Sequence, residues 1–203
     1  MKQGSPEWLQ ARCGLATASC FADVLATLKS GGEAASRKNY RAQLIAERLT
    51  GVPADSYVST EMKWGTEQEP FARIAYEATT GNIVLEVAFI RHPELMAGAS
   101  PDGLIGEDGQ MELKCPNTAT HIDALLKGMD PGHIPQIQGN LWMSGRKWCD
   151  FVSYDPRMPE RMQLYVQRIE RDDKYIANLE SEVRKFLVEV DKVIAELEAK
   201  IAR

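Results

Sequence analysis

The stretch from Ser100 to Lys114 constrains the fold of this chain most, because it combines a turn signal with two short strand patterns. Residues 106–110 contain an Asp-Gly dipeptide, which is typical of a β-hairpin. Side chains alternate between the two faces of a strand, so Glu112 and Lys114 share one face while Leu113 points to the other. The sequence therefore predicts a hairpin that places a carboxylate and an ammonium together on a sheet.

The register of this hairpin decides whether Asp102 joins them. With a two-residue loop at 108–109, Asp102 would face Cys115 and lie on the wrong side. With a three-residue loop at 107–109 and Gly109 in a left-handed bulge, Asp102 faces Lys114. We predict the second register, because it brings all three charged groups to one face. A break in the pairing one residue after Asp102 would achieve the same result.

This arrangement has the chemistry of a metal-dependent phosphodiesterase. Asp102 and Glu112 on neighbouring strands, with the backbone carbonyl of Leu113, form an oxygen-rich set that suits Mg²⁺ or Mn²⁺. Such an ion polarises a phosphoryl oxygen and lowers the pKa of a bound water. Lys114 would position that water and offset negative charge in the transition state. The alternative is an ordinary surface hairpin, in which these residue types are common.

Six short motifs in the first 140 residues add to the hairpin pattern. They are Gly4-Ser5-Pro6-Glu7-Trp8 with Arg12, Thr17-Ala18-Ser19, Trp64-Gly65-Thr66-Glu67-Gln68-Glu69, Ser100-Pro101-Asp102-Gly103, Glu112-Leu113-Lys114-Cys115-Pro116 and Gln136-Ile137-Gln138. In this order they resemble the PD-(D/E)XK superfamily, and within it the phage lambda exonuclease and YqaJ-type viral recombinase family. The resemblance implies a processive exonuclease that degrades the 5′-ended strand of a duplex end and leaves a 3′ overhang.

The resemblance also implies roles for individual residues. Asp102, Glu112 and the Leu113 carbonyl would bind Mg²⁺, with Mn²⁺ as a substitute, and Lys114 would be the catalytic lysine. A further active-site acid, which binds a second metal or its waters, matches Glu69. Without the Trp-Gly context, that glutamate would be expected on a plain solvated helix face. A glutamine beside the scissile phosphate matches Gln136.

Four residues match the family's pocket for the terminal 5′-phosphate, namely Arg12, Ser19, Lys29 and Ser100. The best-known member has an arginine where this chain has Lys29, and lysine cannot bind phosphate through a bidentate fork. Alternative roles exist for two of the four. Arg12 would cover the indole of Trp8, four residues earlier on a helix. Ser19 would cap a helix, and a helix N-terminus itself favours phosphate.

Composition and charge agree with one cytoplasmic domain over residues 1–203. The chain is 44% hydrophobic, has a net charge of −5 and shows no apolar stretch long enough to cross a membrane. Residues 1–50 hold seven bases and four acids, whereas residues 51–115 hold eleven acids and four bases, as expected if one part binds phosphates and the other cuts them. A chance charge fluctuation is the alternative. The four cysteines form no C-x-x-C pair, which argues against zinc or iron-sulphur sites.

The pattern of helix and strand signals predicts an α/β fold, with a mixed sheet flanked by helices around a restriction-endonuclease-like core. Expected helices begin at Pro6 and cover about 19–27, 35–50, 62–79, 118–127 and 135–144, followed by a long C-terminal helix from 172 to about 201. Expected strands lie near 83–91, 96–102, 104–107, 110–115, 148–154 and 162–169.

The C-terminal helix is amphipathic and roughly 45 Å long at 1.5 Å per residue. It packs on its own domain or, in its distal half, on a neighbouring subunit. The family resemblance implies a ring-shaped homotrimer around double-stranded DNA, and a single-strand annealing recombinase as partner in phage or prophage recombination within a bacterial host. Two other functions remain open, which are an endonuclease and an inactive DNA-end-binding or scaffold protein.

Overall fold

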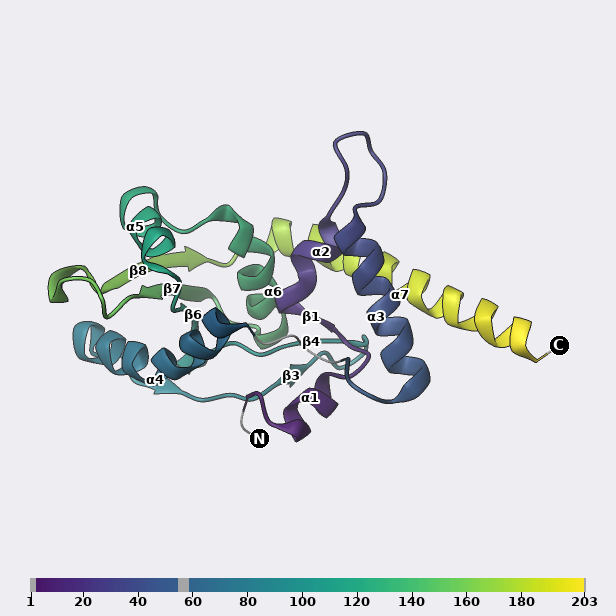
Figure 1. The fold of residues 1–203 in the computed structure, drawn as a ribbon, viewed down its shortest axis with the longest axis horizontal. Coiled ribbons are helices and arrows are strands. Elements are labelled where there is room, and N and C mark those ends of the chain that lie inside the picture. The colour runs from purple at the N-terminus through teal and green to yellow at the C-terminus, as the bar shows by residue number, and fades with distance from the viewer. Residues whose placement is uncertain (1–2, 55–58, 203) are drawn as a thin grey trace.

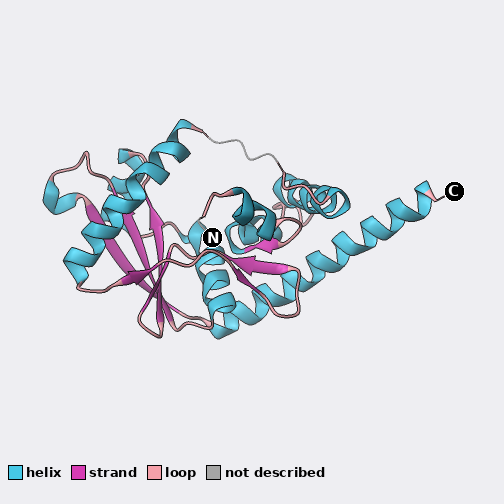
Figure 2. Cartoon of the chain, turned by 90° about the horizontal axis from the view of Figure 1, so that it is seen from below, coloured by secondary structure: helices cyan, strands magenta, loops and turns pink. Residues whose placement is uncertain are grey.

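A computed structural model describes residues 3–54 and 59–202. Its main sheet has the strand order β2-β5-β6-β7-β8, in which β6 and β7 run parallel and the other neighbours are antiparallel. These strands are β2 Val84–Leu85, β5 Gly103–Ile105, β6 Gly109–Lys114, β7 Trp148–Tyr154 and β8 Leu164–Glu170. A smaller sheet, β1-β4-β3, contains β1 Ala16–Thr17, β4 Ala97–Ala99 and β3 Ile90–Arg91. The predicted α/β class with mixed pairing and flanking helices is confirmed, although the strands form two sheets (Figure 2).

The helices mostly follow the sequence signals (Figure 1). They are α1 Pro6–Arg12, α2 Phe21–Leu25, α3 Ala35–Thr50, α4 Thr60–Thr80, α5 Thr118–Lys127, α6 Ile134–Ser144 and α7 Asp173–Ile201, with short 3-10 turns η1 Ala18–Cys20, η2 Pro131–His133 and η3 Glu160–Met162. Ser5 caps α1 by accepting a hydrogen bond from the Trp8 amide, and Gly51 and Gly81 end α3 and α4 in the left-handed conformation. The helix expected at 19–27 is instead η1 followed by the shorter α2.

The strand predicted over 83–91 is wrong as a single element, because the chain passes there from one sheet to the other. Its first part is β2, which pairs with β5, and its last part is β3, which pairs with β4. Between them, the carbonyl of Ala88 accepts a hydrogen bond from the Trp8 indole at 2.8 Å, and the carbonyl of Val87 accepts one from the Gln3 amide at 3.2 Å. Side chains from the N-terminal segment therefore satisfy backbone groups that a continuous strand would pair.

Different helices cover the two faces of the main sheet. On one face, Tyr76 of α4 packs with Met111 and Leu113 of β6. On the other, Ile137 of α6 packs with Phe151 of β7. Because side chains alternate along β6, Gln110, Glu112 and Lys114 lie on the α6 face. This layering places a buried carboxylate between the sheet and α6.

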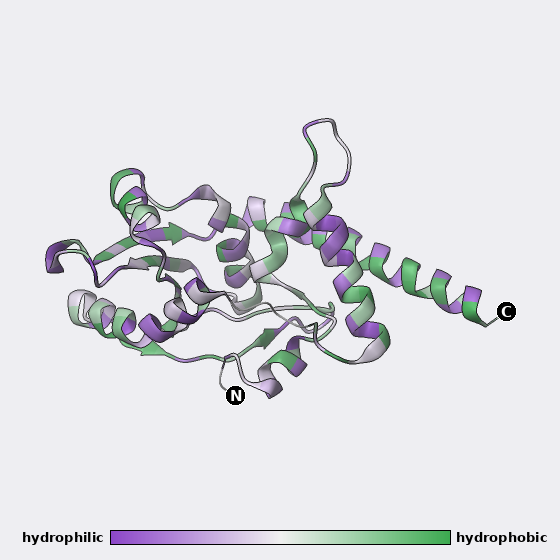
Figure 3. Cartoon of the chain, viewed as in Figure 1, coloured by the Kyte–Doolittle hydropathy of each residue, from purple (hydrophilic) through white to green (hydrophobic). Residues whose placement is uncertain are grey.

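The long helix α7 is covered along only part of its length. Its buried residues run from Ile176 to Val190, and those from Leu179 onward form a core with Phe21 of α2 and Leu44 of α3. Beyond them, Ile201 is 84% exposed, and the last turns extend past the rest of the chain (Figures 1 and 3). The proximal part of α7 therefore packs on its own chain, whereas its distal end does not. None of the described helices is sufficiently long and apolar to cross a membrane.

Candidate active site

The hairpin β5-β6 brings Asp102 next to β6, although its turn differs from the predicted one. The structure pairs Leu104 with Gln110, so the three-residue loop is 106–108 and the left-handed residue is Gly106, with φ of 52°. The predicted loop at 107–109 with a left-handed Gly109 is wrong. Gly109 is instead the first residue of β6, where an added Cβ would overlap the Trp148 ring.

Asp102 lies one residue before the regularly paired part of this hairpin. The pairing of β5 with β6 begins at Gly103, which faces Met111, and the amide of Asp102 also donates to the carbonyl of Met111, at 3.1 Å. The ladder is therefore broken beside Gly103, which is the alternative arrangement that the sequence allowed. Besides burial, Glu112 and Lys114 both affect the pKa of Asp102, so the three charged groups lie close together.

Glu112 lies at the centre of this group. Its side chain is 1% exposed, and Oε1 accepts hydrogen bonds from Lys114 Nζ and Gln136 Nε2, both at 2.5 Å. Its other oxygen, Oε2, accepts from Asn140 Nδ2 at 2.9 Å. Both carboxylate oxygens are thus held by donors, so a buried charge is stabilised without solvent.

Asn140 is the residue that sequence reasoning missed. It is 1% exposed and lies four residues after Gln136 on α6, so both amides point to the same side of the helix. The spacing of Gln136 and Asn140 was the available signal. The predicted Gln136 does reach the group, and its Oε1 also accepts a bond from Lys114 at 3.4 Å.

The charges of Asp102, Glu112 and Lys114 together favour the binding of a cation. Burial raises the pKa of the Asp102 carboxyl, and the neighbouring Glu112 raises it further against the opposing effect of Lys114. Burial works against the charge of Lys114, but the Glu112 and Asp102 carboxylates outweigh it and raise the pKa of the ammonium. The ionised form of Asp102 is thus disfavoured beside Glu112, and a bound divalent ion would relieve this repulsion.

The donor set fits a hard metal ion. Asp102 Oδ2 accepts from the Leu113 amide at 2.7 Å, and the amide and carbonyl of one strand residue point to the same side, so the Leu113 carbonyl lies on the Asp102 side of β6. Within residues 3–54 and 59–202, no three His, Cys, Asp or Glu side chains form a metal-binding group by themselves. The oxygen set Asp102, Glu112 and the Leu113 carbonyl therefore depends on the backbone, and it suits Mg²⁺ or Mn²⁺.

Glu69 lies near this set without joining it as a third side-chain ligand. It is an exposed residue of α4, the helix on the opposite face of the sheet from α6. Desolvation by surrounding atoms raises the pKa of Glu69, while Arg73 and Lys114 lower it. The effect of Lys114 on its pKa places Glu69 within electrostatic range of the group.

A second group, around Arg12, contains three of the four predicted phosphate-binding residues. The Arg12 guanidinium donates to Ser100 Oγ at 3.3 Å and to Ser19 Oγ at 3.2 Å, and it also donates to Thr17 Oγ1 at 3.3 Å. It stacks 4.0 Å from the ring centroid of Trp8, so it covers the indole and faces the hydroxyls at once. In the described part of the chain no carboxylate pairs with Arg12, which leaves its charge available to an anion.

Lys29 lies in the loop between α2 and α3, which projects from the body of the chain (Figure 1). It is exposed and has no hydrogen bond or ion pair among the described residues, and its phosphate-binding role stays a prediction. One alternative is corrected. Ser19 is not a helix cap, since it lies inside η1 and α2 begins after Cys20 with no side-chain cap.

Sequence comparison matches residues 7–147 to the YqaJ-like viral recombinase domain. The chain belongs to the YqaJ-like viral recombinase family. Among solved structures similar to this YqaJ-like chain is LHK-Exo, an alkaline exonuclease from Laribacter hongkongensis, with 48% identity, 98% of each chain covered and a TM-score of 0.90. LHK-Exo in complex with dAMP gives 49% identity, the same coverage and a TM-score of 0.91.

Two more distant relatives extend this likeness. A phage-related exonuclease from Haemophilus somnus 129PT shares the fold at 16% identity, with 90% of this YqaJ-like chain and 96% of that chain covered and a TM-score of 0.74. The protein ExoD of Escherichia coli K12 is 34% identical over 72 residues, which are 36% of this chain and 82% of that protein. The family and its exonuclease relatives support a nuclease that acts in recombination.

Proposed function

We propose that this chain is a Mg²⁺-dependent exonuclease that degrades the 5′-ended strand of linear double-stranded DNA processively and leaves 3′ single-stranded overhangs for recombination by single-strand annealing. The observation that carries the proposal is the carboxylate of Glu112, which is buried beside Asp102 and bonded to Lys114. The guanidinium of Arg12, which has no ion pair within residues 3–54 and 59–202, lies among serine hydroxyls and would supply a separate anion site. Together they provide one place to cut a phosphodiester and another to hold a terminal phosphate.

Asp102, Glu112 and the Leu113 carbonyl would hold the Mg²⁺, and Mn²⁺ would substitute. The ion supplies Lewis-acid activation of the scissile phosphate and lowers the pKa of water. Lys114 keeps its proton beside Glu112 and stabilises charge that develops on the phosphoryl oxygens. Gln136 bonds to both Lys114 and Glu112 through its amide, and it would also contact the scissile phosphate. Glu69 would orient water bound to the ion.

Arg12, Ser19 and Ser100 would bind the terminal 5′-phosphate, which gives digestion its direction. Arginine donates several hydrogen bonds in a fixed plane and is well suited to phosphate. Its stacking on Trp8 holds that plane in place, and the hydroxyls of Ser19 and Ser100 would exchange their bond with Arg12 for bonds to phosphate oxygens.

The wider setting follows from the same function. The 203 residues act as one domain in the cytoplasm of a bacterial host, encoded by a phage or prophage, and a single-strand annealing recombinase takes over the exposed strand. The uncovered end of α7 supports a homotrimer in which this segment contacts a neighbouring subunit. Light scattering coupled to size-exclusion chromatography tests the trimer, and a monomer at every concentration would refute it.

Digestion of a linear duplex labelled at either end, with and without Mg²⁺ and beside a closed circular DNA, tests the activity. The proposal requires metal-dependent release of nucleotides from the 5′ ends only, with the circle left intact. Cutting of the circle would indicate an endonuclease. DNA binding with neither substrate cut would indicate an inactive end-binding protein.

A further inference from the structure

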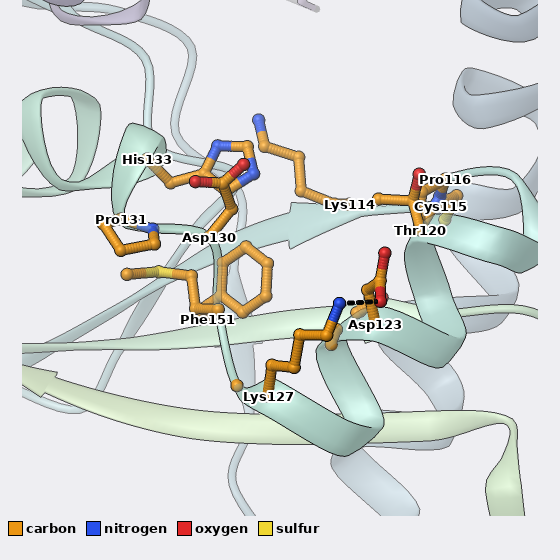
Figure 4. A pocket seen from close by; sticks show the side chains of 14 residues that line it. Lys114, Cys115, Pro116, Thr120, Asp123, Lys127, Asp130, Pro131, His133 and Phe151 are labelled. Carbon is orange, nitrogen blue, oxygen red and sulfur yellow. Dashed lines mark hydrogen bonds and ion pairs between the residues drawn. The ribbon is translucent and has the colours of Figure 1, made fainter.

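The Arg12 group is held together by hydrogen bonds that a phosphate would replace. Arg12 donates to the hydroxyls of Ser19 and Ser100, and in the proposed function these hydroxyls turn to the phosphate oxygens instead. The cavity beside Lys114, shown in Figure 4, is lined by other residues. Once a phosphate is bound, the relative position of Arg12 and Ser19 therefore depends on the backbone that joins them.

The turn that follows Arg12 is fastened to α3 at Gly14. Glu47 Oε2 accepts a hydrogen bond from the Gly14 amide at 2.7 Å, and Arg48 Nε donates to the Gly14 carbonyl at 2.8 Å. Gly14 has φ of 71°, and a Cβ added there would lie 2.7 Å from Arg48 Cγ, so this close approach requires glycine. Both polar groups of the Gly14 backbone are thus held by α3, two residues after Arg12.

The strand that leads to Ser19 is fastened to the same helix by Tyr40. The Tyr40 hydroxyl accepts a hydrogen bond from the Thr17 amide at 2.9 Å. Thr17 is the last residue of β1, and its own hydroxyl accepts a bond from Arg12. Tyr40 and Glu47 are seven residues apart, so they lie on the same side of α3. One side of α3 therefore holds the backbone at two points between the arginine and the serine.

The two α3 side chains are buried and rigidly held. Tyr40 and Glu47 are each 6% exposed. Glu47 Oε1 accepts two further bonds, from Gln43 at 2.9 Å and from the Ala54 amide at 3.1 Å, so three donors fix the carboxylate. Burial lowers the pKa of the Arg12 guanidinium, and the nearby Tyr40 and Glu47 oppose this effect. Both α3 residues thus lie within electrostatic range of Arg12.

We propose that Tyr40 and Glu47 are positioning residues that hold Arg12 and Ser19 in the arrangement required by a terminal 5′-phosphate, without contacting the phosphate themselves. The inference rests on the proposed function, in which the Arg12 group binds the end of the DNA. A site whose backbone is fixed in advance loses less conformational freedom on binding, and its affinity is higher for that reason. Loosening the segment 14–17 would weaken the capture of phosphorylated ends and leave the chemistry at Lys114 unchanged.

The test compares digestion of linear duplexes with a 5′-phosphate or a 5′-hydroxyl by the full-length protein with Mg²⁺. Glu47→Gln is nearly isosteric, but its amide nitrogen would face one of the N–H groups that the carboxylate accepts. We expect the KM for phosphorylated ends to rise about tenfold, the scale of one lost hydrogen bond to a charged group, with kcat within about twofold of the wild type. The KM for hydroxyl ends should not change.

Tyr40→Phe removes a single oxygen and should shift the KM for phosphorylated ends in the same direction, so it remains informative if Glu47→Gln does not fold. Arg41→Gln is the control, because Arg41 is also on α3 but binds Glu33 and Glu189 and, among the described residues, not the segment 14–17. This variant should affect both kinds of end alike. Thermal unfolding of each variant measures its folding separately.

Combination with Arg12→Ala separates positioning from general stability. Glu47→Gln should add nothing to the loss that Arg12→Ala causes on phosphorylated ends, because the group that Glu47 positions is then absent. A further loss in the double variant would overturn the inference.

The preference of the wild type for phosphorylated ends distinguishes the remaining outcomes. If that preference is present but unchanged in Glu47→Gln and Tyr40→Phe, or if these variants lose equally on both ends, the positioning role is wrong while phosphate binding by Arg12 stands. If the wild type uses both ends equally, phosphate binding by Arg12 is refuted, and the inference with it.

Discussion

Asn140 donates a hydrogen bond to Oε2 of Glu112 over 2.9 Å, and both side chains are 1% exposed. Lys114 and Gln136 both bind the other oxygen of this carboxylate, so Asn140 is the sole side chain of the described residues that holds Oε2. The orientation of the Glu112 carboxylate therefore depends on the amide of Asn140.

We predict that Asn140→Leu lowers the cleavage rate by roughly 10- to 100-fold, the equivalent of one lost hydrogen bond to a buried charge. Binding of Mn²⁺, measured by calorimetry without DNA, should weaken as well. Ser144→Ala is the matched control, because Ser144 lies one turn further along α6 and donates to Gln110 rather than to Glu112. Wild-type cleavage and Mn²⁺ affinity in Asn140→Leu would show that Glu112 does not need this amide.

Lys114→Met should retain DNA binding and lose most cleavage. Lys114 bonds directly to Glu112 and faces the proposed site of charge development, so its loss affects the transition state more than the bound DNA. We expect the single-turnover rate to fall by roughly 10²- to 10³-fold, with a Kd for a duplex end within about threefold of the wild type. A single-turnover rate close to that of the wild type would show that Lys114 takes no part in catalysis.

Arg12→Ala should affect substrates with a terminal phosphate selectively. Arg12 contacts the hydroxyls of Ser19 and Ser100, which we propose as phosphate ligands. We expect a loss of roughly 10- to 100-fold on 5′-phosphorylated ends and a much smaller loss on 5′-hydroxyl ends. Lys29→Ala serves as the comparison and should reduce the preference less than Arg12→Ala does, because no hydrogen bond joins Lys29 to the described residues of this group. Equal losses of rate on 5′-phosphorylated and 5′-hydroxyl ends would show that Arg12 serves to pack on Trp8 and not to bind phosphate.

The contact of α7 with α3 should weaken in acid. Glu189 accepts bonds from Arg37 at 2.8 and 2.9 Å, and these bonds lower the pKa of Glu189. Because the folded pKa lies below the unfolded one, the stabilisation is complete above the ordinary glutamate pKa of about 4.3 and is lost as the pH falls through the lower folded value.

Glu189→Gln should therefore reduce the free energy of unfolding at pH 7 by no more than about 1 kcal/mol, since Glu189 is partly exposed. The difference from the wild type should shrink below about pH 4. Urea unfolding across this pH range measures it. Glu196→Gln, an exposed residue on the same helix with no ion pair in the described chain, should show no such trend. A difference that grows in acid would contradict the argument.

Local signals predicted the elements that local chemistry determines. The helix at 35–50, the helix at 118–127 and the strand at 148–154 have the predicted bounds, because caps, glycines and periodicity all lie within those segments. The break in pairing beside Gly103 was one of the two arrangements that the sequence allowed, although the loop itself was predicted wrongly.

Features that depend on distant contacts were not predictable in the same way. The position of Gly109 is determined by the Trp148 ring, which lies on another strand. The break in the predicted strand at 83–91 depends on bonds from Gln3 and Trp8. No pattern within a single segment contains this information.

In the proposed metal site, the ligand at Leu113 is a backbone carbonyl, and its direction is fixed by the pairing of Asp102 with the Leu113 amide. Alanine scanning therefore cannot delete this ligand, because every residue type carries the same atom. An inventory of functional side chains would report two ligands where the proposed site has three. A one-residue insertion in the loop 106–108 would instead rotate Asp102 to the opposite face and separate the ligands without changing any of them. In the proposed site, the length of that turn would therefore affect metal affinity as the acids themselves do.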